Sequence, residues 1–186
     1  KPNSFPINKK ADIKAVTEYH PDGKGCNVIG ILRGSDPTLA PQVIVAGGHI
    51  DHIGMMPVLM PGALDNASGT VIVMGAAKAL AQSGYKPKRT LMFVLFGGEE
   101  TGLIGSEYLA SHPVVPNENI KALIKIDCLG TGYGLGARIA PKHSTLFNYL
   151  EKANDTYVRR PFKSVPGRDE IITRPRTDDA NFFVKG

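Results

Sequence analysis

Three short apolar runs, each ending in glycine, constrain the fold of this 186-residue chain more than any other feature. They are QVIVAGG at residues 42–48, RTLMFVLFGG at residues 89–98 and IKALIKIDCLG at residues 120–130. Their hydrophobicity is continuous, whereas a strand with one face in water alternates apolar and polar residues. The three runs therefore predict strands that are covered on both faces, as in a parallel sheet.

The segments around these runs predict helices and a sheet edge. Residues 66–82 are apolar nearly all round, and residues 103–111 and 144–156 also have helical patterns. The alternation of strands and helices predicts a three-layer, doubly wound α/β fold with a mixed, mainly parallel sheet. Residues 11–20 and 26–34 alternate more clearly, which predicts an antiparallel hairpin at an edge of that sheet.

The bulk composition excludes several classes of protein. The formal charge of +5 comes largely from scattered lysines and arginines without a basic, aromatic-rich stripe, so we expect no nucleic-acid partner. The sequence has no apolar run of about 18 residues, so we expect no membrane span. The first residues, KPNSFPINKK, lack the apolar centre of a signal peptide. Cys26 and Cys128 are expected to be buried free thiols. The sequence contains no feature that indicates the oligomeric state.

Polar side chains follow each predicted strand at the point where the strand ends. Ligands of doubly wound sheets gather at the carboxyl ends of the strands, where these side chains are expected to meet. One further acidic residue stands just before the helix predicted at residues 66–82. The group consists of one histidine and five acidic residues, His49, Asp51, Asp65, Glu99, Glu100 and Asp127.

So many carboxylates remain ionised and close together only with cations among them. Two carboxylates about 4 Å apart repel by roughly 4 kcal/mol at an effective dielectric of about 20. Carboxylate oxygens with an imidazole suit zinc, and also manganese or cobalt. Two-metal sites hold their ions about 3.5–4 Å apart and often share a carboxylate. We therefore predict that one residue of the Glu99-Glu100 pair binds metal and that the other accepts a proton from a polarised water.

Simpler structural roles stay open for these residues. The glutamate pair can form a solvated turn, and His49 can be a hydrogen-bonded structural histidine. Asp65 or Asn66 can cap the helix that begins there. His52 is assigned a structural role or a place around the site. The other histidines are expected on the surface, and they are His20, His112 and His143.

Four segments resemble, in order and spacing, the signature segments of the M28 family of zinc metallopeptidases. They are GGHIDHIG, PGALDNASG, GGEETGLIGSEYL and IDCLG. The resemblance extends over residues 26–186 and implies the zinc exopeptidase fold, which is also called phosphorylase/hydrolase-like. The segment NVIGILRGSDP is similar to members that carry a protease-associated domain upstream. The family contains co-catalytic aminopeptidases, and its relatives include glutamate carboxypeptidases and glutaminyl cyclases.

The resemblance implies two zinc ions. His49, Asp65 and Asp127 would hold the first ion, and Asp65 would bridge it to a second ion on Glu100. Glu99 would be the general base of the reaction.

The resemblance also implies two features around the ligands. Asp51 would orient His49 by contacting its ring from outside the ligand set, as carboxylates often do for metal-binding histidines. The peptide bond between Asp65 and Asn66 would be cis, as it is in the family.

The end of the chain departs from the family pattern. Family members continue into another core strand and an HTxxDT-like motif, whose histidine completes the second zinc site. This sequence stops at Gly186, before either feature. We therefore expect residues 1–186 to be a single catalytic domain that is truncated at the C-terminus, with truncation at the N-terminus left open. The second zinc site and the sheet are expected to be incomplete.

Two further departures concern single positions. Asp179 stands where many members have histidine, and Asp178 and Asp179 either shape the substrate pocket or cap a helix that begins at Ala180. Lys125 stands where an uncharged residue is commoner. It shares a strand face with Asp127, so it either pairs with an acid of the site or reaches solvent.

These expectations lead to a zinc-dependent exopeptidase, an aminopeptidase that removes N-terminal residues from a peptide substrate. A carboxypeptidase or a glutaminyl cyclase on the same scaffold is the alternative within the enzyme class. A non-catalytic metal-binding fragment is the alternative outside it. Secretion, to a periplasm or outside the cell, is implied by the resemblance alone.

Overall fold

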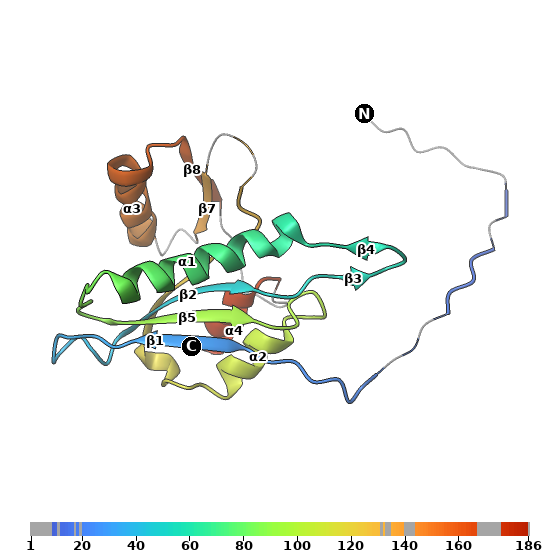
Figure 1. Ribbon diagram of the computed structural model, residues 1–186, viewed down its shortest axis with the longest axis horizontal. Helices are drawn as coiled ribbons and strands as arrows, with labels where there is room; N and C mark the ends of the chain where they lie inside the picture. Colours follow the sequence, from blue (N-terminus) through green and yellow to red (C-terminus); the bar gives the residue numbers. More distant parts are fainter. Residues whose placement is uncertain are drawn as a thin grey trace.

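The computed structural model describes residues 9–10, 12–16, 18, 20–130, 132, 135–139, 144–166 and 176–185. Its centre is a four-stranded sheet in the order β1-β5-β2-β6 (Figure 1). These strands are, in that order, Val28–Leu32, Thr90–Phe96, Val43–His49 and Ile120–Lys125. β2, β5 and β6 run parallel, and β1 runs antiparallel to β5. The three apolar runs thus form the parallel part of a mixed sheet, as predicted.

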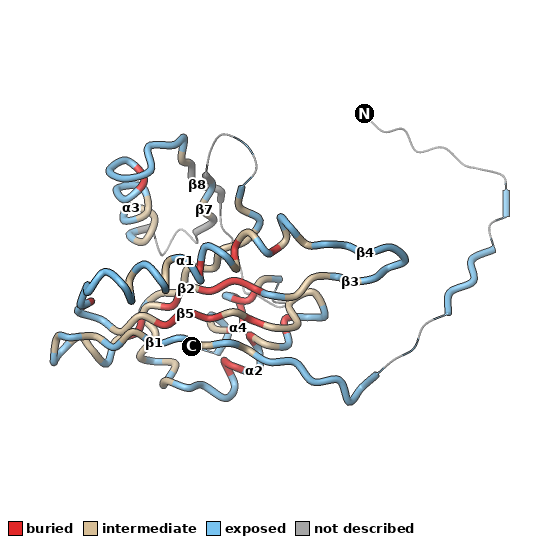
Figure 2. Tube along the Cα trace, viewed as in Figure 1, coloured by how far each residue is buried: buried red, intermediate tan, exposed pale blue. Residues whose placement is uncertain are grey.

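Helices cover both faces of this sheet. α1 (Ser68–Gln82) packs on one face, and α2 (Ile104–Ser111) and α4 (Asp178–Lys185) pack on the other (Figure 1). Burial is concentrated in β2 and β5 (Figure 2). Side chains at alternate strand positions meet α2 and form the core cluster, which contains Val43, Val45, Met92, Val94, Phe96 and Leu109. The three-layer α/β fold is therefore confirmed.

The strand register brings the predicted site residues to one edge of the sheet. His49 of β2 lies opposite Phe96 of β5, and Gly47 of β2 lies opposite Lys125 of β6. Because the three strands run parallel, the residues that follow them emerge together at their carboxyl ends. We call this edge the carboxyl rim.

The predicted hairpin of residues 11–20 and 26–34 is wrong. The described residues between 12 and 20 form no strand and are exposed, and this segment runs away from the sheet in Figure 1. β1 instead pairs along its whole length with β5, from Val28 opposite Leu95 to Leu32 opposite Leu91. β5 is thus the partner of β1, which lies at the edge of the sheet as predicted, and no described strand pairs with the other edge of β1.

A second, two-stranded parallel sheet lies apart from the first and was not predicted. It pairs β7 (Leu135–Ile139) with β8 (Phe162–Pro166). Between these strands the helix predicted at residues 144–156 is divided into α3 (Ser144–Ala153) and a π-helical turn, Asn154–Val158. The remaining short elements are a π-helical turn, Ala63–Ala67, and a 3₁₀ turn, Asn117–Asn119.

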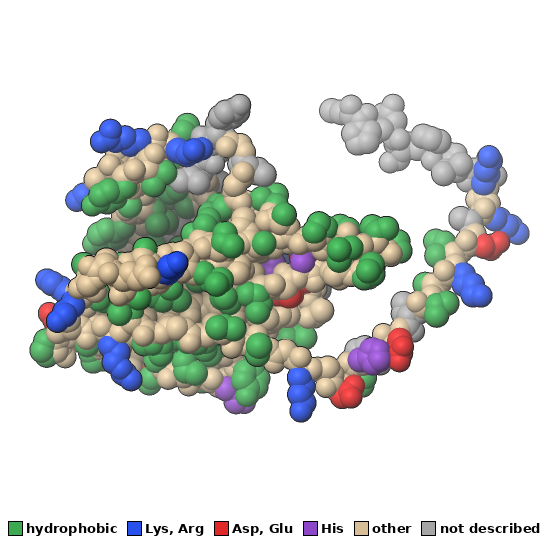
Figure 3. Space-filling model, viewed as in Figure 1, with side chains coloured by type: hydrophobic (Ala, Val, Ile, Leu, Met, Phe, Trp, Pro, Cys, Tyr) green, Lys and Arg blue, Asp and Glu red, His purple; other side chains and the backbone are tan. Residues whose placement is uncertain are grey.

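A small hairpin projects from the carboxyl rim between His49 and α1. It pairs β3 (Gly54–Met55) with β4 (Leu59–Met60). Its surface is apolar (Figure 3), with exposed side chains at Met55, Met56, Val58 and Leu59. None of the helices in the described ranges has the length and apolar character needed to cross a membrane.

Candidate metal centre

His49 ends β2 and presents one ring nitrogen to the acidic residues of the rim. Its side chain is only 1% exposed. Nδ1 lies 3.0 Å from the backbone carbonyl oxygen of Asp51, to which it donates when it carries the ring proton. That tautomer leaves Nε2 as an acceptor, 3.1 Å from Asp65 Oδ1 and 3.5 Å from Asp127 Oδ1. His49 is thus oriented as histidine ligands of metals usually are, with the second nitrogen fixed by a hydrogen bond.

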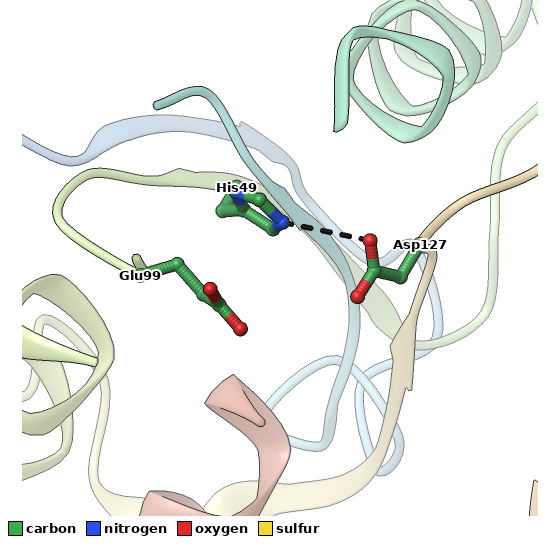
Figure 4. A group of neighbouring side chains, drawn as sticks. All are labelled: His49, Glu99 and Asp127. Atoms are coloured by element: carbon green, nitrogen blue, oxygen red, sulfur yellow. Dashed lines mark ion pairs between the residues drawn. The ribbon is translucent and has the colours of Figure 1, made fainter. Parts of the chain in front are cut away.

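Asp127 follows β6 and has one carboxylate oxygen whose contact among the described residues is an ion pair with His49, at 3.5 Å. Oδ2 accepts a hydrogen bond from the Lys125 ammonium, whereas Oδ1 is buried and has no hydrogen-bond partner among the described residues. This unsatisfied oxygen faces Nε2 of His49 (Figure 4). A buried carboxylate oxygen without a donor is costly, and a bound cation would remove that cost.

The Glu99-Glu100 turn follows β5, and Asp51 fixes its backbone. The two Asp51 carboxylate oxygens accept hydrogen bonds from the amides of Glu99, at 3.0 Å, and Glu100, at 3.1 Å. The two glutamate side chains then diverge. Glu99 points toward His49 and Asp127 (Figure 4), and Oε1 of Glu100 lies 2.7 Å from Nδ1 of His52. The turn is therefore not merely solvated, because its two carboxylates serve different neighbours.

The described residues form three groups of possible metal ligands, in each of which the ligand atoms lie within 4.8 Å of one another. One of them, Asp65, Asp127 and Cys128, takes its two acids from the neighbourhood of the other two groups. We call His49, Glu99 and Asp127 the closed cluster, and His52, Asp65 and Glu100 the open cluster. Asp65 also contacts His49 of the closed cluster, so it stands between the two. Imidazole nitrogens and carboxylate oxygens are the donors that zinc takes in catalytic sites. The residues present fit zinc.

Asn66, and not Asp65, satisfies the start of α1. Oδ1 of Asn66 accepts the amide of Gly69 at 2.9 Å, and its amide nitrogen donates to the carbonyl oxygen of Ile126 at 3.0 Å. Asp65 is left free to face the site, and the peptide bond between Asp65 and Asn66 is cis, as the resemblance implies. Gly69 permits this close approach, since a Cβ there would lie 2.4 Å from the Ile126 oxygen.

The charges of the metal-free centre shift the pKa values of its residues. Burial opposes protonation of His49, but contact with Asp127 and the charge of Glu99 outweigh burial and raise the His49 pKa to about 9. Contact with His49 in turn holds the pKa of Asp127 well below its usual range. Burial raises the pKa of Glu99. Without metal, therefore, the imidazolium of His49 supplies positive charge that a bound cation would replace.

Lys125 turns into the site and not toward solvent. Its side chain is 8% exposed, and Nζ contacts Asp127, Glu99 at 3.7 Å and Asp178 at 4.0 Å. Burial opposes the charged ammonium, but the hydrogen bond to Asp127 and the other acids outweigh it and raise the pKa of Lys125. Of the two alternatives open for this residue, pairing with acids of the site is confirmed.

Of the two alternatives for Asp178 and Asp179, capping of a helix that begins at Ala180 is wrong, because α4 already begins at Asp178. The alternative that they shape the substrate pocket stays a prediction. Thr177 donates its hydroxyl to Asp179, which is exposed. Asp178 is fully buried, and neither carboxylate oxygen has a hydrogen-bond partner in the part of the chain that the structure describes. Burial raises the pKa of Asp178.

The structure gives His52 a contact in the site and contradicts the predicted burial of the two cysteines. His52, for which a structural role or a place around the site is predicted, lies 2.7 Å from Oε1 of Glu100 in the open cluster. Its position three residues after His49, beyond the end of a buried strand, is a signal for a place close to the ligands. Cys26 and Cys128 are free thiols, but both are exposed and not buried. Cys128 follows the end of β6 with a φ of 50°, outside the strand pattern on which its burial was predicted.

The family model described as Peptidase family M28 matches residues 27–186. A probable zinc metalloprotease of Pyrenophora teres f. teres is 34% identical over 125 residues, which cover 64% of this chain and 26% of the relative. Leucine aminopeptidase 1 of Paracoccidioides brasiliensis is 32% identical over 146 residues, covering 69% of this chain and 37% of the relative. The chain therefore spans between about a quarter and two fifths of the length of these curated relatives.

A likeness to solved structures supports the fold. The zinc aminopeptidase BSAP of Bacillus subtilis superposes with a TM-score of 0.68 and 22% sequence identity. The match covers 86% of this chain and 37% of that chain. The shared architecture is the mixed, mainly parallel sheet with helices on both faces.

Proposed function

Because the chain belongs to peptidase family M28, we propose that it carries the catalytic centre of a zinc-dependent aminopeptidase, a metallo-exopeptidase that hydrolyses N-terminal residues of peptides. One observation supports this most directly. His49, Glu99 and Asp127 converge from the ends of three parallel strands, and the Asp127 oxygen that faces His49 is buried and unsatisfied. Among similar proteins, one named leucine aminopeptidase 1 favours the amino end of the substrate as the site of cleavage.

The proposed zinc ligands are His49, Asp65, Glu100 and Asp127. His49 and Asp127 would hold one ion, and Glu100 a second, with Asp65 shared between them. His52 is added to this set, because its contact with Glu100 gives the second ion a nitrogen donor from the described chain. Glu99 is left out of the ligand set. Its neighbour Glu100 supplies the carboxylate of the open cluster, and the reaction needs a further carboxylate to accept a proton from the attacking water.

Zinc bound at this centre would polarise the scissile carbonyl and acidify a water molecule. A carboxylate of Glu99 accepts a proton from the attacking water and delivers it to the nitrogen of the leaving amine as the peptide bond breaks. Burial raises the pKa of this carboxyl, which makes its carboxylate a stronger base than that of an exposed glutamate. Asp51 holds the backbone of Glu99 in place through the amide hydrogen bond, which is a positioning role.

The test compares the hydrolysis of leucine p-nitroanilide and its N-acetylated form by the purified chain. We expect release of p-nitroaniline from the free-amino substrate only, its loss with 1,10-phenanthroline and its return on adding zinc. Turnover of blocked peptides with release of a C-terminal residue would instead indicate a carboxypeptidase. Zinc binding with no turnover of any peptide would indicate a metal-binding module and would refute the catalytic proposal.

The site of action is proposed on the family resemblance. We propose that the protein works outside the cytoplasm, in a periplasm or in the surrounding medium. Cell fractionation with an antibody to the chain tests this, and recovery of the protein in the cytoplasmic fraction alone would contradict it.

A further inference from the structure

Lys125 carries a positive charge in the rim, which opposes the expected cation. An ammonium removed from water costs several kcal/mol unless acidic partners surround it, and a lysine at a strand end can usually extend its head into solvent. Lys125 does not do so, because its side chain is 8% exposed and its ammonium contacts three carboxylates. A buried ammonium next to an expected metal ion therefore suggests a specific role.

The contacts of Lys125 divide the two oxygens of Asp127 between different partners. The ammonium takes Oδ2 as its hydrogen-bond acceptor. Oδ1 is thereby turned toward Nε2 of His49, where it is buried and unsatisfied. A carboxylate with one oxygen fixed by a donor presents the other in a single direction, and outer partners of this kind orient metal ligands.

Asp178 holds the other side of the same ammonium. This residue begins α4, is fully buried, and has Lys125 4.0 Å away as its ion-pair partner among the described residues. Glu99, at 3.7 Å, is the third contact. Lys125 therefore lies between three acids that come from β5, β6 and α4, which leaves its head group little freedom.

We propose that Lys125 is a positioning residue, which aims Oδ1 of Asp127 at the metal position beside His49 and keeps Glu99 next to it. The inference rests on the proposed function, because it assumes that the closed cluster binds zinc. The ammonium also repels a dication by simple electrostatics. Orientation and repulsion have opposite effects on zinc affinity, so the sign of the change on removing Lys125 decides between them.

The experiment measures zinc affinity by competition with a chromophoric chelator in the unaltered chain and three variants. Lys125→Met removes the donor and keeps the length, and we expect zinc affinity to fall about 10- to 100-fold, as for other partners that orient ligands. Lys125→Gln keeps a hydrogen-bond donor without charge, and we expect it to restore most of the affinity. Lys121→Met, an exposed lysine on the same strand, is the matched control and should bind zinc normally.

Cobalt substitution gives a readout that a purely structural role would not change. The visible absorption of bound cobalt reports the geometry of its ligands, so we expect an altered band in Lys125→Met and a normal band in Lys121→Met. Zinc affinity in Lys125→Met equal to or above that of the unaltered chain, or an unaltered cobalt band, would overturn the proposal.

Two controls separate the possible failures. Lys125→Met leaves Asp178 buried without its partner, so the double variant Lys125→Met/Asp178→Asn is measured as well, and circular dichroism confirms that both are folded. If only the double variant folds, its zinc affinity decides by the same criterion. If the unaltered chain binds no zinc, the proposed function fails and this inference fails with it. If the unaltered chain and Lys125→Met bind zinc equally well, the inference about Lys125 is refuted and the proposed function stands.

Discussion

The closed and open clusters lie side by side on the same rim but are built differently. The closed cluster comes from the ends of three adjacent parallel strands, whose register fixes the backbone of its residues. The open cluster takes His52 and Asp65 from the two ends of the segment that contains the β3–β4 hairpin. Asp65 is 44% exposed, whereas His49 is 1% exposed. The strand ends therefore fix the closed cluster, whereas the open cluster depends on the position of the segment that contains the β3–β4 hairpin.

The largest expected effect separates the two adjacent glutamates. Glu99→Gln removes the base and should lower kcat about 10²- to 10⁴-fold, while zinc content measured by atomic absorption stays normal. Glu100→Gln, the matched control one residue away, should instead lower zinc content at the open cluster. Equal loss of zinc in both variants would mean that Glu99 is a ligand and that the clusters are not distinct in role.

The two histidines should differ in how much zinc affinity they contribute. His49→Ala removes a buried ligand and should weaken the tighter zinc site by more than about 100-fold, beyond the loss seen for partners outside the ligand set. His52→Ala should weaken only the second, looser zinc. Isothermal titration calorimetry can resolve the two binding steps. A single step lost equally in both variants would contradict the division into two clusters.

The smallest effect is a pH dependence of zinc binding at the closed cluster. His49 has its pKa raised to about 9 in the metal-free chain, because Asp127 and Glu99 outweigh the effect of burial. Zinc needs the neutral imidazole, so binding between pH 7 and 8 should release about one proton per ion at this cluster. Affinity should therefore rise with pH and level off near pH 9. Calorimetry in buffers of different ionisation enthalpy counts the proton, and His49→Ala should abolish its release.

The same raised pKa predicts how the metal-free chain responds to pH. A group whose pKa is higher in the folded than in the unfolded state stabilises the fold at low pH. The contribution of His49 is complete below its ordinary pKa of 6.5 and disappears as the pH rises through about 9. Denaturant unfolding of the chelator-treated chain at pH 6 and pH 9 measures this loss, and added zinc should reverse it.

The central sheet and the rim could be predicted because each depends on local signals that agree. Continuous apolar runs mark strands covered on both faces, and residues after parallel strands must meet at one edge. His49, Glu99 and Asp127 therefore lie together, as their positions alone indicate. Their assignment as ligands or base stays a prediction.

Other features depend on contacts that no local pattern specifies. β1 has a sequence suited to an edge strand, but its partner was decided by the free edge of β5, some 60 residues away in the chain. The sequence places Lys125 in a strand, but it does not decide whether the side chain points into the site or toward solvent. The inward turn of Lys125 brings the ammonium to Asp127, Glu99 and Asp178. Asp178 belongs to α4, whose approach to β6 arises only from packing of the whole domain.

Asp51 has a consequence for inhibitor design. A single carboxylate accepts the amides of both Glu99 and Glu100, so the turn that supplies one side chain to each cluster moves as a unit. If Glu100 holds zinc and Glu99 is the base as proposed, the distance between the base and that ion would be nearly constant from one bound state to the next. A stiff bidentate compound of matched length would then lose little conformational entropy on binding, and a flexible one of equal chemistry would bind less tightly.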